Sequence, residues 1–565
     1  MGTGNLFTTT TNPTILHRSR VLFHNLASYF VVGFLFILLA GHENTNPRLG
    51  ESHIDFYQSE CQHLLEIHAK ASQFNPQAVS GSMDFFIEAL TSEFYAQRHF
   101  SPAWTINYTG TGHLDTLIQL LDSAVYFGLP EPIINAASLN NTLFEMEKDA
   151  FDDNKLRQRV QLELAATRSA IKYMLLLSKG IRQNDTTQQF LDYAFRMPHI
   201  LNTSIETNNL SETILAQQPN IPMYNSIIAQ LPVYIETLKN ISKSTDGLAK
   251  SILASVLFYE GILEQPAFDS LHSVEQSIKI YQAKNHLSST GKLCRQTVNS
   301  MAERLEKNYM RIALNLDRLR KVEITSGNFI FVNIPSYSLH AFHNNKEEKT
   351  FNVVVGKEKT PTPVLSSRLE KIITNPYWTV PKSIAYNEML SRIRKDSSYL
   401  KRNRYFIINW KEETVHDTLV NWYHEDPLGK RYWIRQENGW GNALGKVKFI
   451  FPNNYRVYLH DTPSKRLFKR EHRAFSHGCI RVQHPDELAQ YLSDKYYAPY
   501  NDSISISESI AGREREVFDI AANVEVHIQY ITCSADTENG LKFHKDLYKQ
   551  DKTELEAIFE WQKAI

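Results

Sequence analysis

The sequence predicts a multidomain α+β protein with a helical N-terminal half and a β-rich C-terminal part. Its 565 residues are too many for one hydrophobic core, and two to four domains are expected. Apolar residues recur at helical spacing from residue 54 to residue 320. From residue 321 onward the apolar period changes to two, which is the period of β-strands.

The bulk composition excludes several classes of protein. The hydrophobic fraction of 42% and the charged fraction of 22% are those of an ordinary globular chain. The formal net charge is zero and the chain has no extended cluster of lysine and arginine, so nucleic acid is not an expected partner. The four cysteines are widely spaced and form no CxxC pair, which argues against a disulfide framework and a zinc knuckle.

The N-terminal region predicts a membrane anchor. Residues 1–20 are polar, and residues 21–41 form an apolar segment about long enough to cross a bilayer core. Arg18 and Arg20 precede this segment and Glu43 follows it, so residues 1–20 are expected in the cytoplasm and the remainder outside it. A cleaved signal peptide is the alternative. The segment ends in a poor cleavage site, which favours an uncleaved, single-pass signal anchor.

Two helical regions are expected after the anchor. Residues 54–250 have leucines at helical spacing, and we expect one helical domain in which the aromatic segment 94–104 packs into the core. Residues 251–320 are expected to form a small helical module with three helices. An apolar stripe supports the first helix of this module: Val274, Ile278 and Tyr281.

Residues 321–535 are expected to form one β-rich, sandwich-like domain, because short apolar runs of period two alternate there with turn signals. Residues 383–430 are more polar and have helical stretches, so we interpret them as a helical insertion that serves as a lid. Residues 536–565 are predicted to be a polar C-terminal tail.

The chemically distinctive stretch is residues 458–482. Cys479 follows a turn of small residues that ends at Gly478, and it precedes an apolar β-former, Ile480. His460 lies 19 residues upstream, at the end of a short strand-like run. Two neighbouring strand ends would bring such side chains together. A thiol with a histidine close by is the arrangement that activates a cysteine nucleophile.

Two histidines are candidates for the base that takes the thiol proton, because a free thiol has a pKa near 8.5 and the thiolate is the nucleophile. His460 is one, and His477, two residues before Cys479, is the other. The backbone amides of Gly478 and Cys479 are candidate donors to a developing oxyanion. The nearest groups that could orient a histidine are Asp461 and Ser476.

Other interpretations of the cysteine and histidines remain open from the residues alone. A cysteine and a histidine close in sequence are often incidental. A zinc site is a second alternative, although no pair in it has a recognised ligand spacing. Its ligands would be His460, His472, His477 and Cys479.

A family resemblance rests on two motifs: His460-Asp461-Thr462-Pro463 and Ser476-His477-Gly478-Cys479-Ile480-Arg481-Val482. Together they resemble the active-site motif of the L,D-transpeptidase (YkuD-type) family. Further segments are similar to the large, scaffold-bearing subclass of that family: residues 94–104, 375–381, 442–449 and 451–453. Residues 277–291 resemble the peptidoglycan-binding-like module of three helices.

The resemblance implies a peptidoglycan L,D-transpeptidase of cell wall biogenesis, and residues 54–250 would be its scaffold domain. Cys479 would attack a tetrapeptide stem, release D-Ala and hold a thioester, and a second stem would then give a 3→3 cross-link. His460 would move the proton, because some members of the subclass carry serine in place of His477. Supporting roles are implied for His477, Gly478, Ser476 and Arg481. Substrate contacts are implied for Tyr458, Trp440, Asn442 and Trp378.

No metal and no cofactor is implied by the resemblance. The implied partners are a tetrapeptide donor stem, a diaminopimelate-containing acceptor stem and carbapenem-type β-lactams as inhibitors, with other cell-wall synthases as candidates. The implied location is the bacterial inner membrane, contacted through the N-terminal helix, with the catalytic part in the periplasm. Two alternative functions stay open: an L,D-carboxypeptidase or other hydrolase on the same site, and a catalytically idle peptidoglycan-binding scaffold.

Overall fold

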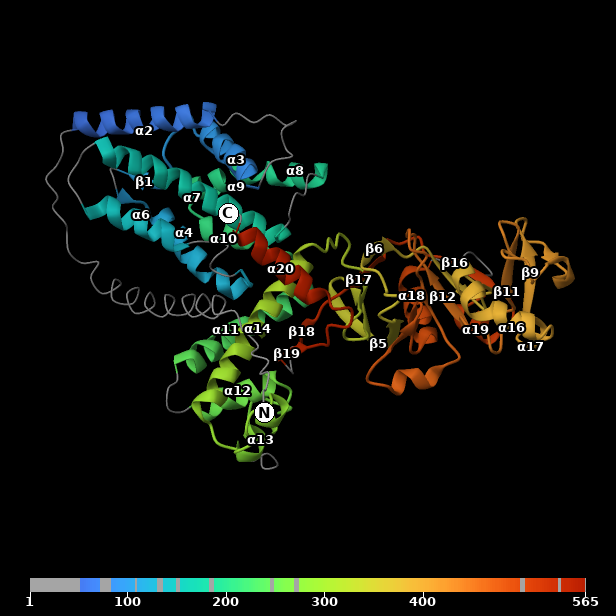
Figure 1. Cartoon of the computed structure of the whole chain (residues 1–565). Coiled ribbons are helices and arrows are strands. Elements are labelled where there is room, and N and C mark those ends of the chain that lie inside the picture. The colour runs from blue at the N-terminus through green and yellow to red at the C-terminus, as the bar shows by residue number, and fades with distance from the viewer. Residues whose placement is uncertain are drawn as a thin grey trace, which may run out of the picture. The chain divides into compact units, whose positions relative to one another are not determined.

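The structure is a computed structural model, and it describes residues 51–71, 83–106, 109–129, 136–148, 153–181, 187–243, 248–268, 274–497, 504–536 and 540–563. The chain divides into two compact units. The helical unit comprises the residues up to Lys321 together with Cys533–Phe543 and Gln550–Ile565, and the β-rich unit comprises Val322–Thr532 and His544–Lys549. The predicted α+β organisation is therefore confirmed (Figure 1).

The helical unit is built almost entirely from α-helices (Figure 1). Their bounds are α2 (Glu51–Ala71), α3 (Met83–Gln97), α4 (Gly112–Asp122), α6 (Ala136–Lys148), α7 (Asp153–Lys179), α8 (Gln188–Ala194), α9 (Met197–Glu206), α10 (Leu210–Leu215), α11 (Pro222–Lys243), α12 (Lys250–Tyr259), α13 (Val274–Lys284) and α14 (Arg295–Arg320). The 3-10 helix η2 (Ser123–Phe127) and the short hairpin β1 (Thr105–Ile106) and β2 (Thr109–Gly110) complete its N-terminal part. Helix α7 packs against α2, α3, α6 and α9.

The aromatic segment 94–104 packs into this helical core, as the sequence predicts. Trp104 is fully buried, and its indole Nε1 donates to Thr167 Oγ1 at 2.9 Å. Glu163 on α7 accepts hydrogen bonds from the backbone N–H groups of residues 103–105 at 2.7–2.9 Å and from the Tyr95 hydroxyl at 2.9 Å. Buried polar groups need such partners, so this carboxylate fixes the segment against α7.

Gln282 closes the loop between α13 and α14. Its Nε2 donates to Thr297 Oγ1 and to the Lys292 carbonyl, both at 3.0 Å, and its Oε1 accepts from Gly291 N at 2.9 Å. Gly291 has a φ of +74°, which a residue with a side chain rarely adopts. These contacts explain the glutamine near the end of α13 and the glycine in the loop. The resemblance of residues 277–291 to a peptidoglycan-binding-like module stays a prediction.

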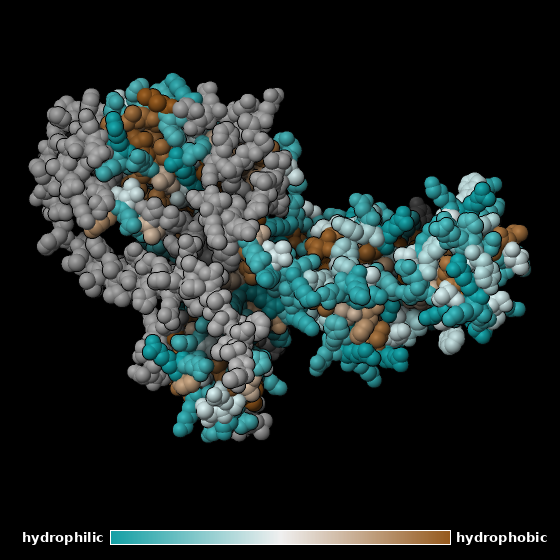
Figure 2. All heavy atoms as spheres, in the orientation of Figure 1, coloured by the Kyte–Doolittle hydropathy of each residue, from teal (hydrophilic) through white to brown (hydrophobic). Residues whose placement is uncertain are grey.

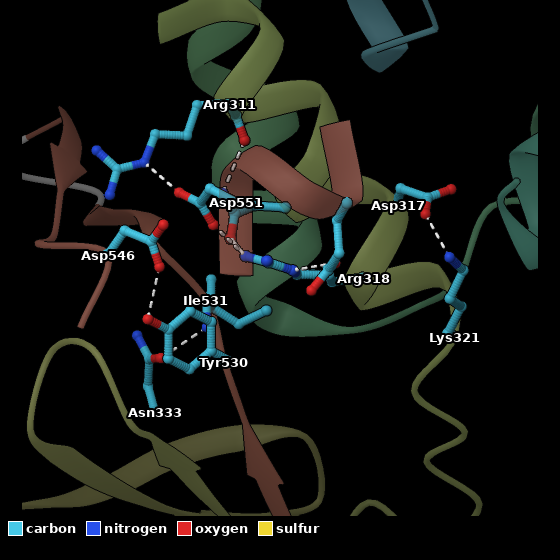
Figure 3. A network of polar contacts seen from close by, with 11 residues as sticks. Arg311, Asp317, Arg318, Lys321, Asn333, Tyr530, Ile531, Asp546 and Asp551 are labelled. Atoms are coloured by element: carbon cyan, nitrogen blue, oxygen red, sulfur yellow. Dashed lines mark hydrogen bonds and ion pairs between the residues drawn. The ribbon is translucent and has the colours of Figure 1, made fainter. Parts of the chain in front are cut away.

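The C-terminal region differs from the polar tail expected for residues 536–565. The strands β18 (Cys533–Asp536) and β19 (Gly540–Phe543) form an antiparallel hairpin that contacts α11, α12 and α14, and α20 (Gln550–Lys563) packs against α14. Arg311 and Arg318 of α14 point toward Asp551 of α20 and form ion pairs with it at 2.9 and 2.8 Å (Figure 3). Asp551 and Glu554 thus pair with arginines of α14. The hairpin and α20 belong to the helical unit, whereas His544–Lys549 between them belong to the β-rich unit.

The β-rich unit contains one large mixed sheet and a smaller one. The strands of the large sheet are β3 (Phe329–Asn333), β4 (Ser338–His343), β5 (Lys346–Gly356), β6 (Leu365–Arg368), β7 (Lys371–Thr374), β12 (Val447–Ile450), β13 (Leu459–His460), β14 (Ala474–Ser476), β15 (Ile480–Val482), β16 (Glu516–Asp519) and β17 (Glu525–Gln529). Their order is β16-β7-β12-β13-β15-β5-β4-β3-β17-β6, and β14 pairs with β5 beside this path.

The sequence predicts a sandwich-like domain. In the structure, the long strand β5 pairs with strands on both of its sides, so the strands form one continuous sheet. The first part of β5 pairs with β4 in the register His343↔Lys346 to Ser338↔Asn352, and its last part pairs with β15 in the register Arg481↔Val354. Helix α18 (Pro485–Tyr496) adds Leu488, Ala489 and Leu492 to the core of this sheet. In the same unit, Tyr530 donates to Asp546 and Asn333 accepts from the Ile531 N–H (Figure 3).

The insertion is only partly helical. It holds α15 (Lys382–Ile384), the π-helix η3 (Ala385–Met389), α16 (Leu390–Lys395) and α17 (Tyr399–Arg402), and also a four-stranded sheet in the order β10-β9-β11-β8. Those strands are β8 (Trp378–Thr379), β9 (Tyr405–Asn409), β10 (Thr414–Val415) and β11 (Tyr432–Gln436). The insertion has a hydrophobic core of its own, which includes Val380, Ile407 and Ile434. A helical insertion at 383–430 was therefore too narrow a prediction.

The predicted cytoplasmic segment 1–20 and membrane anchor 21–41 lie outside the described residues. Within the part of the chain that the structure describes, no helix has both the length and the apolar character needed to cross a membrane. On the face shown in Figure 2, the described surface is mostly hydrophilic with small separate hydrophobic patches.

Candidate active site

Three neighbouring strands position the residues of the candidate site. Strand β13 pairs antiparallel with β12 in the register Lys448↔His460, and parallel with β15 in the register His460↔Arg481. Directly opposed residues on neighbouring strands share one face of the sheet. The predicted proximity of the strand ends that carry His460 and Cys479 is therefore observed, since Cys479 is the residue that enters β15.

The turn before Cys479 is held from two sides. Gly478 has a φ of +113°, and its carbonyl accepts from Thr362 Oγ1 at 2.8 Å. Its N–H donates to Ser476 Oγ at 3.1 Å, so the serine shapes this turn and does not orient a histidine. Because the Gly478 amide already has this partner, the Cys479 amide is the better candidate of the two for an oxyanion donor.

Thr362 and Tyr548 form hydrogen bonds that fix this turn, and the sequence does not predict their role. Thr362 accepts from the Gly356 N–H at 2.9 Å while it donates to Gly478. The Tyr548 hydroxyl accepts from Thr362 N at 3.1 Å and donates to the Gly356 carbonyl at 2.7 Å. The sequence signal is the run Thr360-Pro-Thr-Pro363. Its prolines indicate a rigid loop, but they do not indicate which residue contacts it.

Cys479 is a partly exposed free thiol. Burial raises its pKa, and hydrogen bonds from the Tyr458 backbone and side chain, together with the positive charges of Lys448 and Arg481, act in the opposite direction. Its Sγ lies 4.0 Å from the Arg456 carbonyl oxygen. Burial therefore favours the protonated thiol in the resting enzyme. The hydrogen-bond donors and the cations nearby stabilise the thiolate once it forms.

The turn that presents Tyr458 to the cysteine is organised by Asn453. Its Oδ1 accepts from the backbone N–H groups of Tyr455 and Val457 at 3.1 and 3.0 Å, and its Nδ2 donates to the carbonyls of Phe451 and Val457 at 2.9 and 2.8 Å. An asparagine that bonds its own backbone in this way fixes a turn. The segment Phe451-Pro-Asn453 is thus explained by turn geometry.

His460 is buried and neutral. Its Nδ1 hydrogen-bonds to the backbone carbonyl of Asp461, and because a carbonyl only accepts, Nδ1 carries the proton and Nε2 is the free acceptor. Burial, together with the positive charges of Arg481 and Lys448, lowers the pKa of His460 to about 3, although the hydrogen bond to Asp461 opposes them. The imidazole can accept a proton at Nε2 but is not a resting cation.

The Asp461 carboxylate does not orient His460. Its Oδ2 accepts from Lys446 N at 2.9 Å, and its Oδ1 accepts from Thr462 N at 2.6 Å and from Lys465 Nζ at 2.5 Å. Gly445 leaves room for this side chain, since a Cβ there would lie 2.2 Å from Asp461 Oδ2. The carboxylate therefore fixes the two backbone segments that flank β12 and β13.

His477 faces the insertion. Its Nε2 lies 2.6 Å from Glu388 Oε1 on η3, and both side chains are partly exposed. This contact links the insertion to the cysteine turn. The supporting role predicted for His477 is thus compatible with its position, whereas its candidacy as the base has no support from the contacts it makes.

Tyr458 connects the insertion to the cysteine. Burial raises its pKa, the Cys479 charge adds to the rise, and a hydrogen bond with the Trp378 side chain opposes it. Trp378 is half-buried at the start of the insertion. Lys448 Nζ sits 3.8 Å from the centroid of the Tyr458 ring, on the ring face. Tyr458 and Trp378 were predicted as substrate contacts, whereas Lys448 was noted only as part of a motif.

The other two predicted substrate contacts differ in exposure. Trp440 is 91% exposed on the turn before β12, where Arg404 Nη1 donates to its carbonyl at 2.9 Å. Asn442 is buried, and its amide is used inside the protein: Nδ2 donates to the carbonyls of Pro376 and Glu437, and Oδ1 accepts from Leu444 N. The geometry gives Asn442 a structural role, and only Trp440 is open to a ligand.

The zinc alternative finds no support in the geometry. Among the residues that the structure describes, no group of three or more His, Cys, Asp and Glu side chains is arranged to hold a metal ion. His472 Nδ1 instead lies 3.0 Å from the Tyr337 hydroxyl.

Comparison with known proteins gives two matches to family models and a curated relative. Residues 327–505 match the model of the L,D-transpeptidase catalytic domain (YkuD), and residues 89–231 match the model of a Scaffold domain. A Haemophilus influenzae protein named "Putative L,D-transpeptidase" is 27% identical over 388 residues, which cover 67% of this chain and 76% of that protein.

Proposed function

Because the chain carries an L,D-transpeptidase catalytic domain and a Scaffold domain, we propose that it is a peptidoglycan L,D-transpeptidase that forms 3→3 cross-links between stem peptides in cell wall biogenesis. One observation carries the proposal. Cys479 is a partly exposed thiol on the turn that enters β15, next to the segment Tyr458–His460, which supplies hydrogen bonds to sulfur and a neutral imidazole.

The proposed first step is acylation of the enzyme. Cys479 Sγ attacks the carbonyl carbon at the L-centre of diaminopimelate in a tetrapeptide donor stem, and a C–S bond forms. The amide C–N bond to the terminal D-Ala breaks, and D-Ala leaves with an added proton on its amine. A thioester remains on the enzyme.

The proposed second step transfers the acyl group. The side-chain amine of an acceptor stem attacks the thioester carbonyl, a C–N bond forms and the C–S bond breaks. The amine loses a proton and the cysteine is restored. With water as the acceptor the same site would act as an L,D-carboxypeptidase, and with a lipoprotein lysine it would attach a protein.

His460 is the proposed carrier of the proton. Its free Nε2 accepts the proton of the thiol and returns it to the leaving D-Ala amine, which is general acid–base catalysis. The Cys479 N–H is the proposed oxyanion donor. Arg481 is a candidate for a stem carboxylate contact as well as for tuning the sulfur charge.

The proposed cellular setting follows from residues 1–41 and from the reaction. We propose that residues 21–41 anchor the chain in the bacterial inner membrane in a single pass, with the catalytic part in the periplasm, where stem peptides are found. Other cell-wall synthases are proposed partners. Proteoliposome reconstitution followed by protease protection from the outside tests the topology, and release of the intact chain from the membrane by salt alone would contradict it.

Acylation by a carbapenem tests the proposed nucleophile. The purified chain is expected to gain the mass of one carbapenem on Cys479, and Cys479→Ala is expected to lose the adduct. Cys294→Ala is the matched control, because Cys294 is an exposed thiol outside the site and its removal should leave the adduct intact. A folded wild-type protein that gains no adduct would contradict the transpeptidase assignment.

Digestion of sacculi separates the possible acceptors. Cells that express the wild-type chain are expected to contain 3→3 stem dimers that are absent from cells expressing Cys479→Ala. Shortened tripeptides without dimers would indicate a hydrolase. Unchanged stems, despite binding of the chain to sacculi, would indicate an idle peptidoglycan-binding scaffold.

A further inference from the structure

Lys448, whose positive charge acts on Cys479, has no part in the proposed chemistry. Lys448 on β12 lies opposite His460 on β13, and His460 lies opposite Arg481 on β15. The three side chains therefore form a row on one face of the sheet. Tyr458 and Cys479 each precede a member of this row by two residues, so they continue the same face.

The Lys448 ammonium lies against the ring of Tyr458. Its Nζ is 3.8 Å from the centroid of the Tyr458 ring, which is the geometry of a cation–π contact. Burial lowers the pKa of Lys448, the charge of Cys479 raises it, and Arg515 lowers it. The lysine and the sulfur are thus close enough for each to affect the other's ionisation, and the hydroxyl of the same tyrosine donates a hydrogen bond to the sulfur.

His460 is poorly placed to be the counter-ion of a thiolate in the resting enzyme. It is buried, and both neighbours in the row are cations, which disfavour a third positive charge between them. A charge on sulfur must then be balanced by groups that are already cationic. Lys448 and Arg481 are the cations whose fields act on Cys479.

We propose that Lys448 is a positioning residue of the reaction, and that its ammonium, seated on the Tyr458 ring, supplies the positive charge that stabilises the Cys479 thiolate. The inference rests on the proposed function only in taking Cys479 as the nucleophile. When the S–H bond breaks, the proton passes to His460 Nε2 and Lys448 keeps all its protons. The lysine balances the negative charge until the sulfur forms its bond to the substrate carbonyl.

The pH dependence of Cys479 alkylation tests this role without any peptide substrate. The full chain is treated with iodoacetamide between pH 6 and 10, and the alkylated Cys479 peptide is quantified by mass spectrometry. Lys448→Met is expected to raise the apparent pKa of Cys479 by about one unit, and to slow alkylation roughly tenfold below both midpoints. Lys448→Arg, which keeps the charge, is expected to retain the wild-type midpoint.

The matched control is Lys446→Met. Lys446 is a nearby lysine that immediately precedes the same strand, its side chain is exposed, and its Nζ donates to the Ile510 carbonyl at 3.2 Å. It removes the same charge without changing the row, so its midpoint should match that of the wild type. The other charged or titratable groups of the row are unchanged in all variants: Tyr458, His460 and Arg481. His477 and Glu388, which contact each other beside the cysteine turn, and Arg515, whose charge acts on Lys448, are unchanged as well.

Each outcome decides the matter. An unchanged Cys479 midpoint in Lys448→Met would overturn the proposal, and so would a shift of equal size in Lys448→Arg or in Lys446→Met. If Lys448→Met fails to fold, Lys448→Gln provides the same comparison with a polar end. If carbapenem acylation fails in the wild type while the alkylation shift occurs, the proposed function is wrong and the lysine assignment stands.

Discussion

At the scale of the residue, His460 shows how burial and charge combine at this site. Burial and the two flanking cations all lower the pKa of His460, and only one hydrogen bond opposes them. At Cys479 the same two cations lower the pKa of the thiol while burial raises it. Lys448 and Arg481 therefore favour the neutral imidazole of His460, and they lower the free energy needed to ionise Cys479.

The depressed pKa of His460 predicts a pH dependence of stability. The unfolded chain takes up a proton at this residue near pH 6.5, whereas the folded protein does so only near pH 3. The stability contributed by the neutral histidine is therefore complete above pH 6.5 and is lost as the pH falls toward 3. In that window, the free energy of unfolding of the wild type should fall by up to about 1.4 kcal/mol per pH unit more than that of His460→Gln. Urea unfolding at a series of pH values measures this difference.

A control variant separates this effect from the other titrating groups. His484→Gln is this control: it replaces a histidine whose side chain is 59% exposed, and its unfolding free energy is measured at the same pH values as that of His460→Gln. Parallel curves for the wild type and His460→Gln would contradict the assignment of a neutral, buried histidine.

At the scale of the element, the turn that leads into β12 sets the position of Asp461, whose backbone carbonyl accepts the hydrogen bond from His460 Nδ1. Gly445 has a φ of +61°, and the Asp461 carboxylate occupies the space that a side chain at this position would fill. That carboxylate is bound to the backbone on both of its sides and cannot swing away without losing hydrogen bonds.

Gly445→Ala is therefore expected to destabilise the β-rich unit and slow acylation of Cys479. The new Cβ would lie within 2.5 Å of three Asp461 side-chain atoms. We expect a loss of roughly 3 kcal/mol in the free energy of unfolding, of which about 1 kcal/mol belongs to the positive φ. Gly441→Ala is the matched control, because Gly441 has a φ of +79° and no atom within 4 Å of the new Cβ. Equal losses for the two variants in urea unfolding would refute the steric explanation.

The sequence was sufficient where the signal is local. The period of two around residues 447–482 predicts strands, and with them the proximity of Cys479 and His460. It was insufficient for Lys448 and Thr362, because their contacts depend on the register between strands and on loop closure. It also failed to predict the sheet in the insertion, whose strands are only two to five residues long and are separated by polar turns.

At the scale of the whole molecule, residues 533–543 and 550–565 belong to the helical unit, although His544–Lys549 between them belong to the β-rich unit. The charged residues of this region predict a polar tail, because charge alone does not reveal a buried partner 233 residues away. The Arg318 and Asp551 side chains are only 10% and 11% exposed. Burial lowers the pKa of Arg318, but Glu554 and Asp551 outweigh it and the pKa is raised. The helical unit thus depends on the C-terminus of the chain.

Asp551→Ala is expected to destabilise the helical unit by about 3 kcal/mol, because it removes an anion that pairs with two largely buried arginines. Arg318 keeps its ion pair with Glu554 in this variant. Lys552→Ala is the matched control on the same helix: its side chain is 84% exposed and its pair with Glu556 spans 3.7 Å, so less than about 1 kcal/mol should be lost. Urea unfolding, read by hydrogen exchange of the α14 amides, measures both. Asp551→Asn should fall between them, since it keeps the shape and removes the charge. If α14 exchanges equally in the aspartate and lysine variants, the C-terminal helix does not stabilise the helical unit through this ion pair.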